Sequence, residues 1–511
     1  MKDRIAKSVF WIVWSRGAVQ VLSFLSTLVV ARLLSPADYG LMALAGMWTF
    51  VTSLVAELGL GAAVVQFQDL EDCEVNTCFW LTMSMAGAGY LVLYAAAPAL
   101  AAWFVNPMLS DVLRVTGLSL PLVAVRIIPD SLLRRRLQLD KVSKAEIASV
   151  AVTVPVVLGM AGYGAGVWAL VAGAVVMPLV QSIVSFWFVR WWPGLRIGSR
   201  RLHELLRYSL ATLGSRVGWA AYQQLDMFFI GKLSGEVVLG FYSMAKLLAN
   251  LPSEKISVAV LQLASPVLAG LQADRAAMRT SFLRGLRLVA CLTVPLCLGT
   301  GLVADDLVDL ALGDKWTTVV PLLQVLCLAG LIRSLDVLLP PVLFARYRAT
   351  FMFWWTGGLL LIMTFVFWAG AAWMGALGAA LGWLVVYPFI TAWMAREGLR
   401  ELEMGWTTLW DQVRPVAGAA LIMAGCVLVV RWGIPGSDFE HRLMRLAAAS
   451  GLGALVYGLG MLWWARPLVR EVAEVAGWIL RWNRLASSGV QSLAPNPPRM
   501  TEVRKSARSV N

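Results

Sequence analysis

Residues 29–45, VVARLLSPADYGLMALA, form a short polar link between two long apolar runs near the start of the chain. Ser35 is suited to cap the helix that follows, Pro36 fits its first position, and Asp38 is favoured at its positive N-terminal end. Arg32 lies near the end of the preceding helix, where a cation is favoured. The stretch therefore predicts two helices joined by a tight turn.

The whole chain is as apolar as the runs beside this link. Of its 511 residues, 59% are hydrophobic and 14% are charged, and the mean hydropathy is +0.73. A soluble domain carries about 25% charged residues, whereas apolar runs of about 20 residues, long enough to cross a bilayer, recur along this chain. These features predict an all-α polytopic membrane protein with about 14 transmembrane helices. They exclude a β-barrel, whose strands are short and alternate.

Topology accounts for the net charge of +13, so we predict no nucleic-acid partner. With a cytoplasmic N-terminus, about 29 of the 43 Lys and Arg fall on the cytoplasmic side. Residues 132–144, LLRRRLQLDKVSK, lie there, whereas residues 304–316, ADDLVDLALGDKW, lie outside. The acidic residues 66–76, QFQDLEDCEVN, are the exception. The pattern predicts that both termini are cytoplasmic.

A second copy of the link follows 200 positions later. Residues 15–45 and 215–245 align without a gap, and Gly40 falls on Gly240. Six predicted spans separate the copies, so both enter the membrane from the same side. This arrangement predicts two parallel six-helix lobes. A glycine at the same place in both copies indicates close helix contact.

The predicted domains follow from the repeat and from composition. The final spans lie outside the repeat, the next segment is amphipathic, and the tail is rich in Ser, Pro, Asn and Arg. The predicted units are an N-terminal lobe (1–200), a C-terminal lobe (201–400), two added transmembrane helices (401–466), an interfacial helix (467–485) and a disordered cytoplasmic tail (486–511).

Polar side chains inside the predicted spans are costly in lipid, so each is a candidate for a site. Arg16 and Gln20 are four residues apart and share a helical face, and Arg216 with Gln223 repeats the pattern. Cations outnumber acids here, and a guanidinium binds phosphate in a bidentate manner. We therefore predict a central cavity that attracts an anion such as pyrophosphate. The predicted substrate-binding residues are Arg16, Gln20, Arg216, Gln223, Lys246, Asn250, Arg287 and Arg333.

Two pairs of intramembrane charges have a second interpretation. Arg126 with Asp130, and Arg333 with Asp336, have the i,i+4 and i,i+3 spacing of ion pairs on one helix. Structural pairing and a transport role both remain open for them. Arg126 and Arg287 are also near enough to predicted span ends to extend toward the membrane surface.

The first 190 residues resemble a known family. Residues 29–66, VVARLLSPADYGLMALAGMWTFVTSLVAELGLGAAVVQ, followed by FWLTMS (79–84), APALAAWFVNP (97–107) and LLRRRLQLDK (132–141), resemble the bacterial polysaccharide-transporter or oligosaccharide-flippase family. Its superfamily also holds multidrug and toxin extrusion antiporters and the lipid II flippase. The resemblance implies two six-helix lobes forming a V-shaped cavity, plus two C-terminal helices. It also implies transport of undecaprenyl-pyrophosphate-linked oligosaccharide across the inner membrane by alternating access. Polysaccharide polymerase machinery is then an expected partner, together with the lipid-linked substrate and the bilayer.

Within this resemblance, Arg16 matches an arginine of the first helix that lines the cavity of such flippases. Coupling to a proton or sodium gradient is implied by the superfamily, with Glu57 and Asp226 as candidates. We predict no other cofactor and no metal site, because the chain has only two histidines and its six cysteines are scattered.

Two alternatives stay open. A cation-coupled multidrug antiporter of the same superfamily requires a cavity dominated by acids, and a membrane-embedded polymerase or ligase requires larger external loops. No Walker loop, nucleophile elbow or metal motif is present in the sequence. A transporter rather than an enzyme is therefore the leading hypothesis.

Overall fold

The computed structural model describes residues 2–57, 59–67, 70–136, 138–195, 198, 202–436 and 438–464. The side chains of residues 2–16, 18, 55, 56, 62, 66, 202–217, 252, 254, 255, 258, 259 and 263 lie outside this description. All regular structure in the described chain is helical. The predicted interfacial helix and tail lie outside the described residues.

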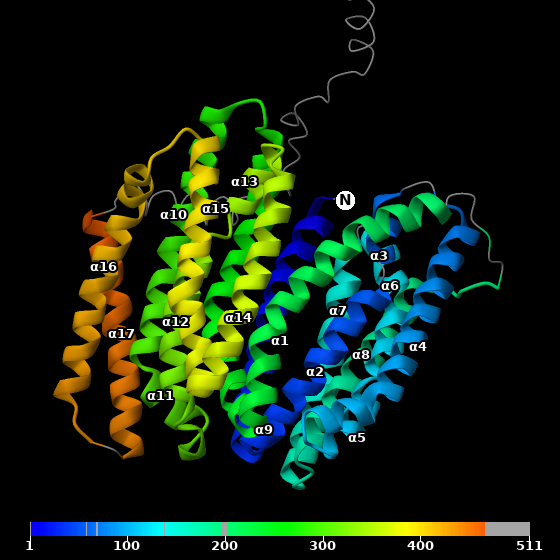
Figure 1. The fold of residues 1–511 in the computed structure, drawn as a ribbon, viewed down its shortest axis with the longest axis horizontal. Helices are drawn as coiled ribbons and strands as arrows, with labels where there is room; N and C mark the ends of the chain where they lie inside the picture. Colours follow the sequence, from blue (N-terminus) through cyan, green and yellow to red (C-terminus); the bar gives the residue numbers. More distant parts are fainter. Residues whose placement is uncertain are drawn as a thin grey trace, which may run out of the picture.

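The helices of the first 190 residues form one group (Figure 1). Within this group, α2 contacts α4, α5, α6 and α8. Their bounds are α1 (Lys2–Leu33), α2 (Pro36–Glu57), α3 (Leu60–Gln66), α4 (Asp72–Trp103), α5 (Met108–Thr116), α6 (Ser119–Arg135), α7 (Leu139–Gly162) and α8 (Val167–Val189).

A second group contains the later helices (Figure 1). It begins with α9 (Leu202–Gly270), whose two helical segments meet at Gly235, and α9 lies between the groups. The others are α10 (Arg275–Leu302), α11 (Ala304–Ala311), η1 (Asp314–Trp316), α12 (Val319–Leu335), α13 (Leu339–Ala345), α14 (Ala349–Leu381), η2 (Gly382–Val386), α15 (Tyr387–Glu401), α16 (Trp406–Gly433) and α17 (Phe439–Trp464).

Nine helical segments in the described chain are long and apolar enough to cross a membrane. The count of 14 therefore stays a prediction, as do the domain boundaries at residues 200, 400 and 466. Several apolar runs are interrupted: the N-terminal cap of α3 is Gly59, whose φ of 69° belongs to the left-handed region. A similar break occurs inside α14, where Gly375 has a φ of 59°. Glycine adopts these angles without the steric cost that a Cβ imposes.

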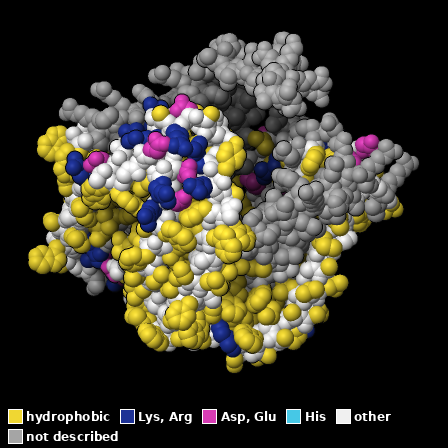
Figure 2. All heavy atoms as spheres, turned by 45° about the horizontal axis from the view of Figure 1, so that its top comes forward, with side chains coloured by type: hydrophobic (Ala, Val, Ile, Leu, Met, Phe, Trp, Pro, Cys, Tyr) yellow, Lys and Arg dark blue, Asp and Glu magenta, His cyan; other side chains and the backbone are white. Residues whose placement is uncertain are grey.

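The surface fits a bilayer environment. Figure 2 shows hydrophobic side chains over the flanks and charged side chains gathered at one end of the molecule. α13 and α15 reach that end in Figure 1. Arg346 and Arg348 follow α13, and both pair with Glu401 at the end of α15, with N–O distances of 3.3 and 2.6 Å. Charges thus mark the end of the bundle and leave its sides apolar, as a membrane protein requires.

The last two helices are attached to α11 by ion pairs. Arg431 of α16 contacts Asp305 at 2.5 Å, and Arg442 of α17 contacts Asp309 at 2.5 Å. Arg445 forks across both carboxylate oxygens of Asp306, which is 1% exposed. The acidic segment, which the charge pattern predicts to lie outside the membrane, is therefore paired with arginines of α16 and α17.

Within the link, residues 34–35 separate α1 from α2, and α2 has the predicted cap. The Asp38 amide donates to the Ser35 hydroxyl at 3.3 Å, and the Ser35 amide donates to the Asp38 carboxylate at 2.9 Å. This reciprocal pair is a capping box with Asp in place of Glu. Arg32 lies in the last turn of α1, as predicted. Its guanidinium also donates to the carbonyls of Leu310 and Ala311 at the end of α11 in the other group.

The repeat-related glycines pack against each other's helices. A Cβ at Gly40 would overlap the Glu236 carbonyl, and a Cβ at Gly240 would overlap the Pro36 carbonyl. Residues 36 and 236 are themselves 200 positions apart, so the two contacts exchange under the repeat. This is the pattern of a pseudo-two-fold axis between α2 and α9. The prediction of close helix contact at this glycine is confirmed.

Further contacts hold the two groups together at the link end, which is the end of the bundle where residues 34–35 and 235 join the repeat-related helices. Lys232, the counterpart of Arg32, donates to the Trp103 carbonyl at 2.6 Å at the end of α4. Each cation thus binds the carboxyl end of a helix in the opposite group, where a positive charge is favoured. Lys315 donates to the carbonyls of Arg32 and Leu34 at 2.7 and 2.6 Å. Burial lowers the pKa of the Lys315 ammonium, and the Asp38 carboxylate opposes that shift.

Candidate functional site

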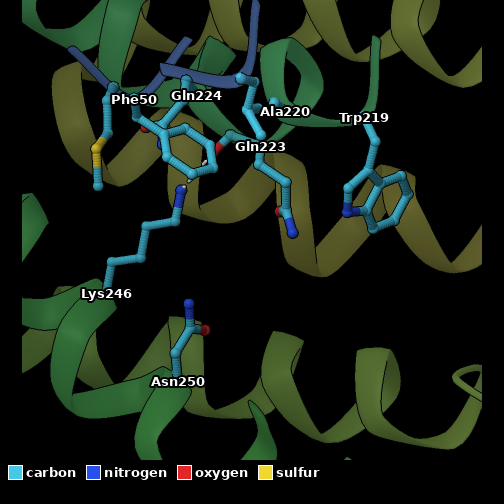
Figure 3. Close-up of a pocket in the computed structure, with 9 residues that line it drawn as sticks. Phe50, Trp219, Ala220, Gln223, Gln224, Lys246 and Asn250 are labelled. Carbon is cyan, nitrogen blue, oxygen red and sulfur yellow. Dashed lines mark hydrogen bonds between the residues drawn. The ribbon is translucent and has the colours of Figure 1, made fainter. Parts of the chain in front are cut away.

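A cavity of about 360 Å³ lies where α2 meets the two segments of α9. Phe50 and Asn250, which line it, are 200 positions apart, so the cavity adjoins the repeat axis. Figure 3 shows Lys246 and Asn250 extending from one segment of α9 toward Gln223 on the facing segment. The lining residues are Phe50 and Leu54 of α2 and Trp219, Ala220, Gln223, Gln224, Met227, Lys246 and Asn250 of α9.

Asp226 lies behind this lining and is fully buried. Its carboxylate accepts bonds from the Lys246 ammonium at 2.7 and 2.9 Å, from the Tyr242 hydroxyl at 2.7 Å and from the Trp383 indole at 3.0 Å. Burying a charge is costly unless it is paired and hydrogen-bonded. Asp226 satisfies both conditions, and it joins the two segments of α9 to the π-helical turn η2.

Arg333 of α12 connects this cluster to the cavity. Its guanidinium donates to the Gln223 side-chain oxygen at 3.3 Å and lies over the Trp383 ring, 4.5 Å from the centroid. Trp383 also packs edge-to-face on Tyr222 at 5.6 Å. The Trp383 ring, supported by Tyr222, therefore holds Arg333 behind Gln223 rather than in the cavity lining.

Arg333 and Asp336, which their i,i+3 spacing predicts as a pair, interact electrostatically, and each also contacts other partners. Asp336 accepts hydrogen bonds from the Tyr387 hydroxyl at 2.7 Å and the Thr391 hydroxyl at 3.3 Å, both on α15. Asp336 is the residue after the end of α12, so its side chain reaches the neighbouring helix.

Arg126 and Asp130 form the ion pair that their spacing predicts, with 2.9 Å between nitrogen and oxygen. The Ser185 hydroxyl of α8 donates to the other Asp130 oxygen at 2.7 Å. This cluster ties α6 to α8 within the first group. Neither residue lines the cavity described above, so the geometry favours the structural interpretation of this pair.

The remaining predicted residues fall in other places. Gln20 is exposed, and Glu57 is half-buried at the last position of α2. Arg287 is half-buried and donates to the Leu283 carbonyl of its own helix at 3.3 Å. The side chains of Arg16 and Arg216 lie outside the described residues. The structure thus gathers Gln223, Lys246 and Asn250 at one cavity, with Arg333 and Asp226 directly behind it.

Four aromatic residues of this region were not among the predicted site residues: Phe50, Trp219, Tyr242 and Trp383. Aromatic residues are abundant in membrane spans, so composition alone could not single them out. For Phe50 a usable signal existed, because the 200-residue offset pairs it with the predicted Asn250. Tyr242 and Trp383 act through hydrogen bonds to Asp226 that no sequence spacing indicates.

Comparison with known proteins now assigns the family. Residues 29–321, more than half of the chain, match the family described as polysaccharide biosynthesis protein. The chain belongs to this family. The resemblance stated from the sequence is confirmed.

Two relatives cover most of the chain. The succinoglycan biosynthesis transport protein ExoT of Rhizobium meliloti (strain 1021) is 26% identical over 488 residues, covering 92% of this chain and 95% of the relative. The teichuronic acid biosynthesis protein TuaB of Bacillus subtilis (strain 168) is 24% identical over 457 residues, covering 86% and 89%. The chain is thus a multi-pass membrane protein of the polysaccharide biosynthesis family.

Among solved structures, the lipid II flippase MurJ in an inward closed conformation has a similar fold. Its TM-score is 0.72 at 12% identity, covering 90% of this chain and all of MurJ. At this identity the likeness concerns the fold alone.

Proposed function

We propose that this chain is a flippase for undecaprenyl-pyrophosphate-linked oligosaccharide repeat units. It would move them across the bacterial inner membrane for exopolysaccharide, capsule or O-antigen (lipopolysaccharide) assembly. The observation that carries this proposal is the cavity at the repeat axis, lined from α2 on one side and α9 on the other. A site shared by two related halves is what alternating access requires.

The contacts at the link end supply the gate for such a cycle. In the present conformation, α2 and α9 touch through Gly40 and Gly240, and Arg32 and Lys232 cap helices of the opposite group. Opening that end would separate these contacts while the ion pairs within each group persist. We propose that the link end faces outward. In the present state this outward end is closed, so that any opening of the cavity is toward the cytoplasm.

A multidrug antiporter is disfavoured by the cavity lining. A cationic drug requires an exposed carboxylate, and none is present among the described lining residues. Asp226 is fully buried, and its charge is matched by Lys246. A polymerase or ligase is disfavoured because ExoT, which aligns with nearly all of this chain, is described as a transport protein.

Deletion of the gene in its host tests the proposal. Lipid-linked oligosaccharide should accumulate and should be accessible to a membrane-impermeant glycan probe only in inside-out vesicles. The wild-type gene should restore access in right-side-out vesicles. Normal delivery to the outer leaflet without the protein would contradict the proposed function.

The same assay tests the cationic part of the cavity that the sequence predicts. Arg16→Ala and Arg216→Ala should each reduce delivery about tenfold if the guanidinium groups bind the pyrophosphate. If both variants deliver the lipid normally, the arginine assignment fails while the transport function stands. Dissipating the proton or the sodium gradient separately identifies the coupling ion.

A further inference from the structure

The cation that lines the described cavity has no donor left for a ligand. An ammonium has three N–H donors. The Lys246 ammonium has three acceptors within 3.0 Å: the two carboxylate oxygens of Asp226 and the Gln223 carbonyl. Its charge is also cancelled by the buried Asp226 carboxylate. Lys246 is therefore a poor anchor for pyrophosphate, although the sequence predicts it as one.

The groups that do face the cavity are amides and aromatic rings. The side-chain amides of Gln224 and Asn250 have no hydrogen-bond partner among the described residues. Gln223 accepts from Arg333 through its oxygen, which leaves its NH₂ group for a ligand. An amide offers donors and an acceptor together, and so it matches hydroxyl groups, which also donate and accept.

Two rings stand on either side of these amides. Phe50 is 43% exposed and Trp219 is 46% exposed, and Figure 3 shows the Gln223 side chain between them. The face of an aromatic ring carries partial negative charge and attracts the partially positive hydrogens of C–H groups. A pyranose ring presents such C–H groups on one face and hydroxyls around its rim.

Trp219 is supported from behind. It packs on Tyr222 with 5.3 Å between centroids, and Tyr222, which is 1% exposed, packs on Trp383. The row of rings restricts the positions open to Trp219, and a pre-positioned aromatic surface loses little freedom when a ligand binds.

We propose that this cavity is a subsite for an uncharged sugar ring, stacked on Trp219 and hydrogen-bonded by Gln223, Gln224 and Asn250. The inference rests on the proposed function and concerns which part of the lipid-linked oligosaccharide lies here. Small-molecule sites occupy about 300–1,000 Å³, so a cavity of about 360 Å³ holds a short part of a repeat unit. The pyrophosphate then binds elsewhere.

The test compares two ligands on purified protein in lipid nanodiscs. One is the lipid-linked oligosaccharide extracted from the deletion strain, and the other is undecaprenyl pyrophosphate without sugar. Trp219→Ala should raise the Kd of the sugar-bearing lipid about tenfold, the loss expected for one aromatic contact. It should leave the Kd of undecaprenyl pyrophosphate unchanged. Trp219→Phe, which keeps an aromatic face, should recover most of the affinity.

Trp368→Ala is the matched control, because Trp368 is 49% exposed on α14 and does not line the cavity. It should alter neither Kd. Asn250→Leu is a second, independent variant and should weaken only the sugar-bearing lipid.

The outcomes separate the two levels of the proposal. Equal weakening of both lipids by Trp219→Ala, or no weakening of either by Trp219→Ala and Asn250→Leu, overturns the sugar subsite and leaves the flippase standing. If the deletion strain accumulates no lipid-linked oligosaccharide, the proposed function fails, and the subsite fails with it.

Discussion

The two repeat-related helix pairs, α1–α2 and the two segments of α9, share a glycine contact and a cation that binds the opposite group, but they differ in their buried charges. Both carry the glycine at the axis, Gly40 and Gly240. Among the side chains that the structure describes in these helices, buried charges occur in the second pair: Asp226 corresponds to Ser26, and Lys246 corresponds to Gly46. The comparison teaches that both helix pairs need the close contact at Gly40 and Gly240. The polar cluster of Asp226 and Lys246 behind the cavity belongs to the second pair.

The links themselves are made by different means. The first uses the Ser35–Asp38 capping box. At the corresponding position of the second, Gly235 has a φ of 83° and a ψ of 175°, a region essentially restricted to glycine. The same turn is thus obtained once from side-chain hydrogen bonds and once from backbone freedom.

The largest expected effect comes from the charges that distinguish the two pairs. Asp226→Asn or Lys246→Met alone leaves an unmatched charge in the interior and should lower the free energy of unfolding by about 3–5 kcal/mol. The double variant should recover much of that loss. Thermal unfolding in detergent measures all three proteins. Ser26→Ala, at the counterpart position, should change little, and an equal loss there would contradict the asymmetry.

The next effect tests the feature that the pairs share. Gly40→Ala and Gly240→Ala each place a Cβ on a backbone carbonyl that cannot rotate away, a cost of about 1–3 kcal/mol to the closed contact. Spin-label distances across the link end should show a shift toward the open form, and delivery of lipid-linked oligosaccharide should fall. The two variants should behave alike.

Gly46→Ala is the control for both glycines, because a Cβ at Gly46 meets no atom within 4 Å. If Gly40→Ala is harmful and Gly240→Ala is silent, the two contacts are not equivalent, and the pseudo-two-fold interpretation is wrong.

A third experiment separates the two kinds of link. Gly235→Ala should cost about 1–3 kcal/mol of unfolding free energy, because a Cβ is strained at this backbone conformation. Ser35→Ala should cost about 1 kcal/mol, the typical loss of a side-chain cap. Chemical denaturation gives both values. A larger loss for Ser35→Ala than for Gly235→Ala would contradict the conclusion that the second link depends on the backbone freedom of glycine.

The smallest effect concerns the exposed cations that cap the opposite group. Arg32→Ala and Lys232→Ala should each weaken closure of the link end by about 0.3–1 kcal/mol. In these variants, a single cysteine introduced beside the link should become more accessible to a thiol reagent. In the wild type, the same cysteine should be more accessible at high salt than at low salt, because salt screens the cation contacts that close this end. Lys144→Ala, which removes an exposed pair within one helix at 3.5 Å, should have no effect on that accessibility.

The structure bears out the parts of the sequence interpretation that depend on neighbours along the chain. The capping box at Ser35 and the Arg126–Asp130 pair are local, since their partners lie three and four residues away. The Arg333–Asp336 pair has the same kind of spacing, but Asp336 also accepts hydrogen bonds from Tyr387 and Thr391 on another helix. Spacing identifies which side chains can meet on one helix but not which neighbours compete for them.

By itself, the sequence determined the class and indicated the family, because hydropathy over about 20 residues reports the membrane directly. The 200-residue offset predicts two related halves. The tertiary structure alone decided the partners of the charges. Lys246 meets Asp226 from 20 positions away, and Arg32 meets the end of α11 from 278 positions away. A buried charge is stabilised by whatever packs around it, and packing between helices is a property of the folded chain.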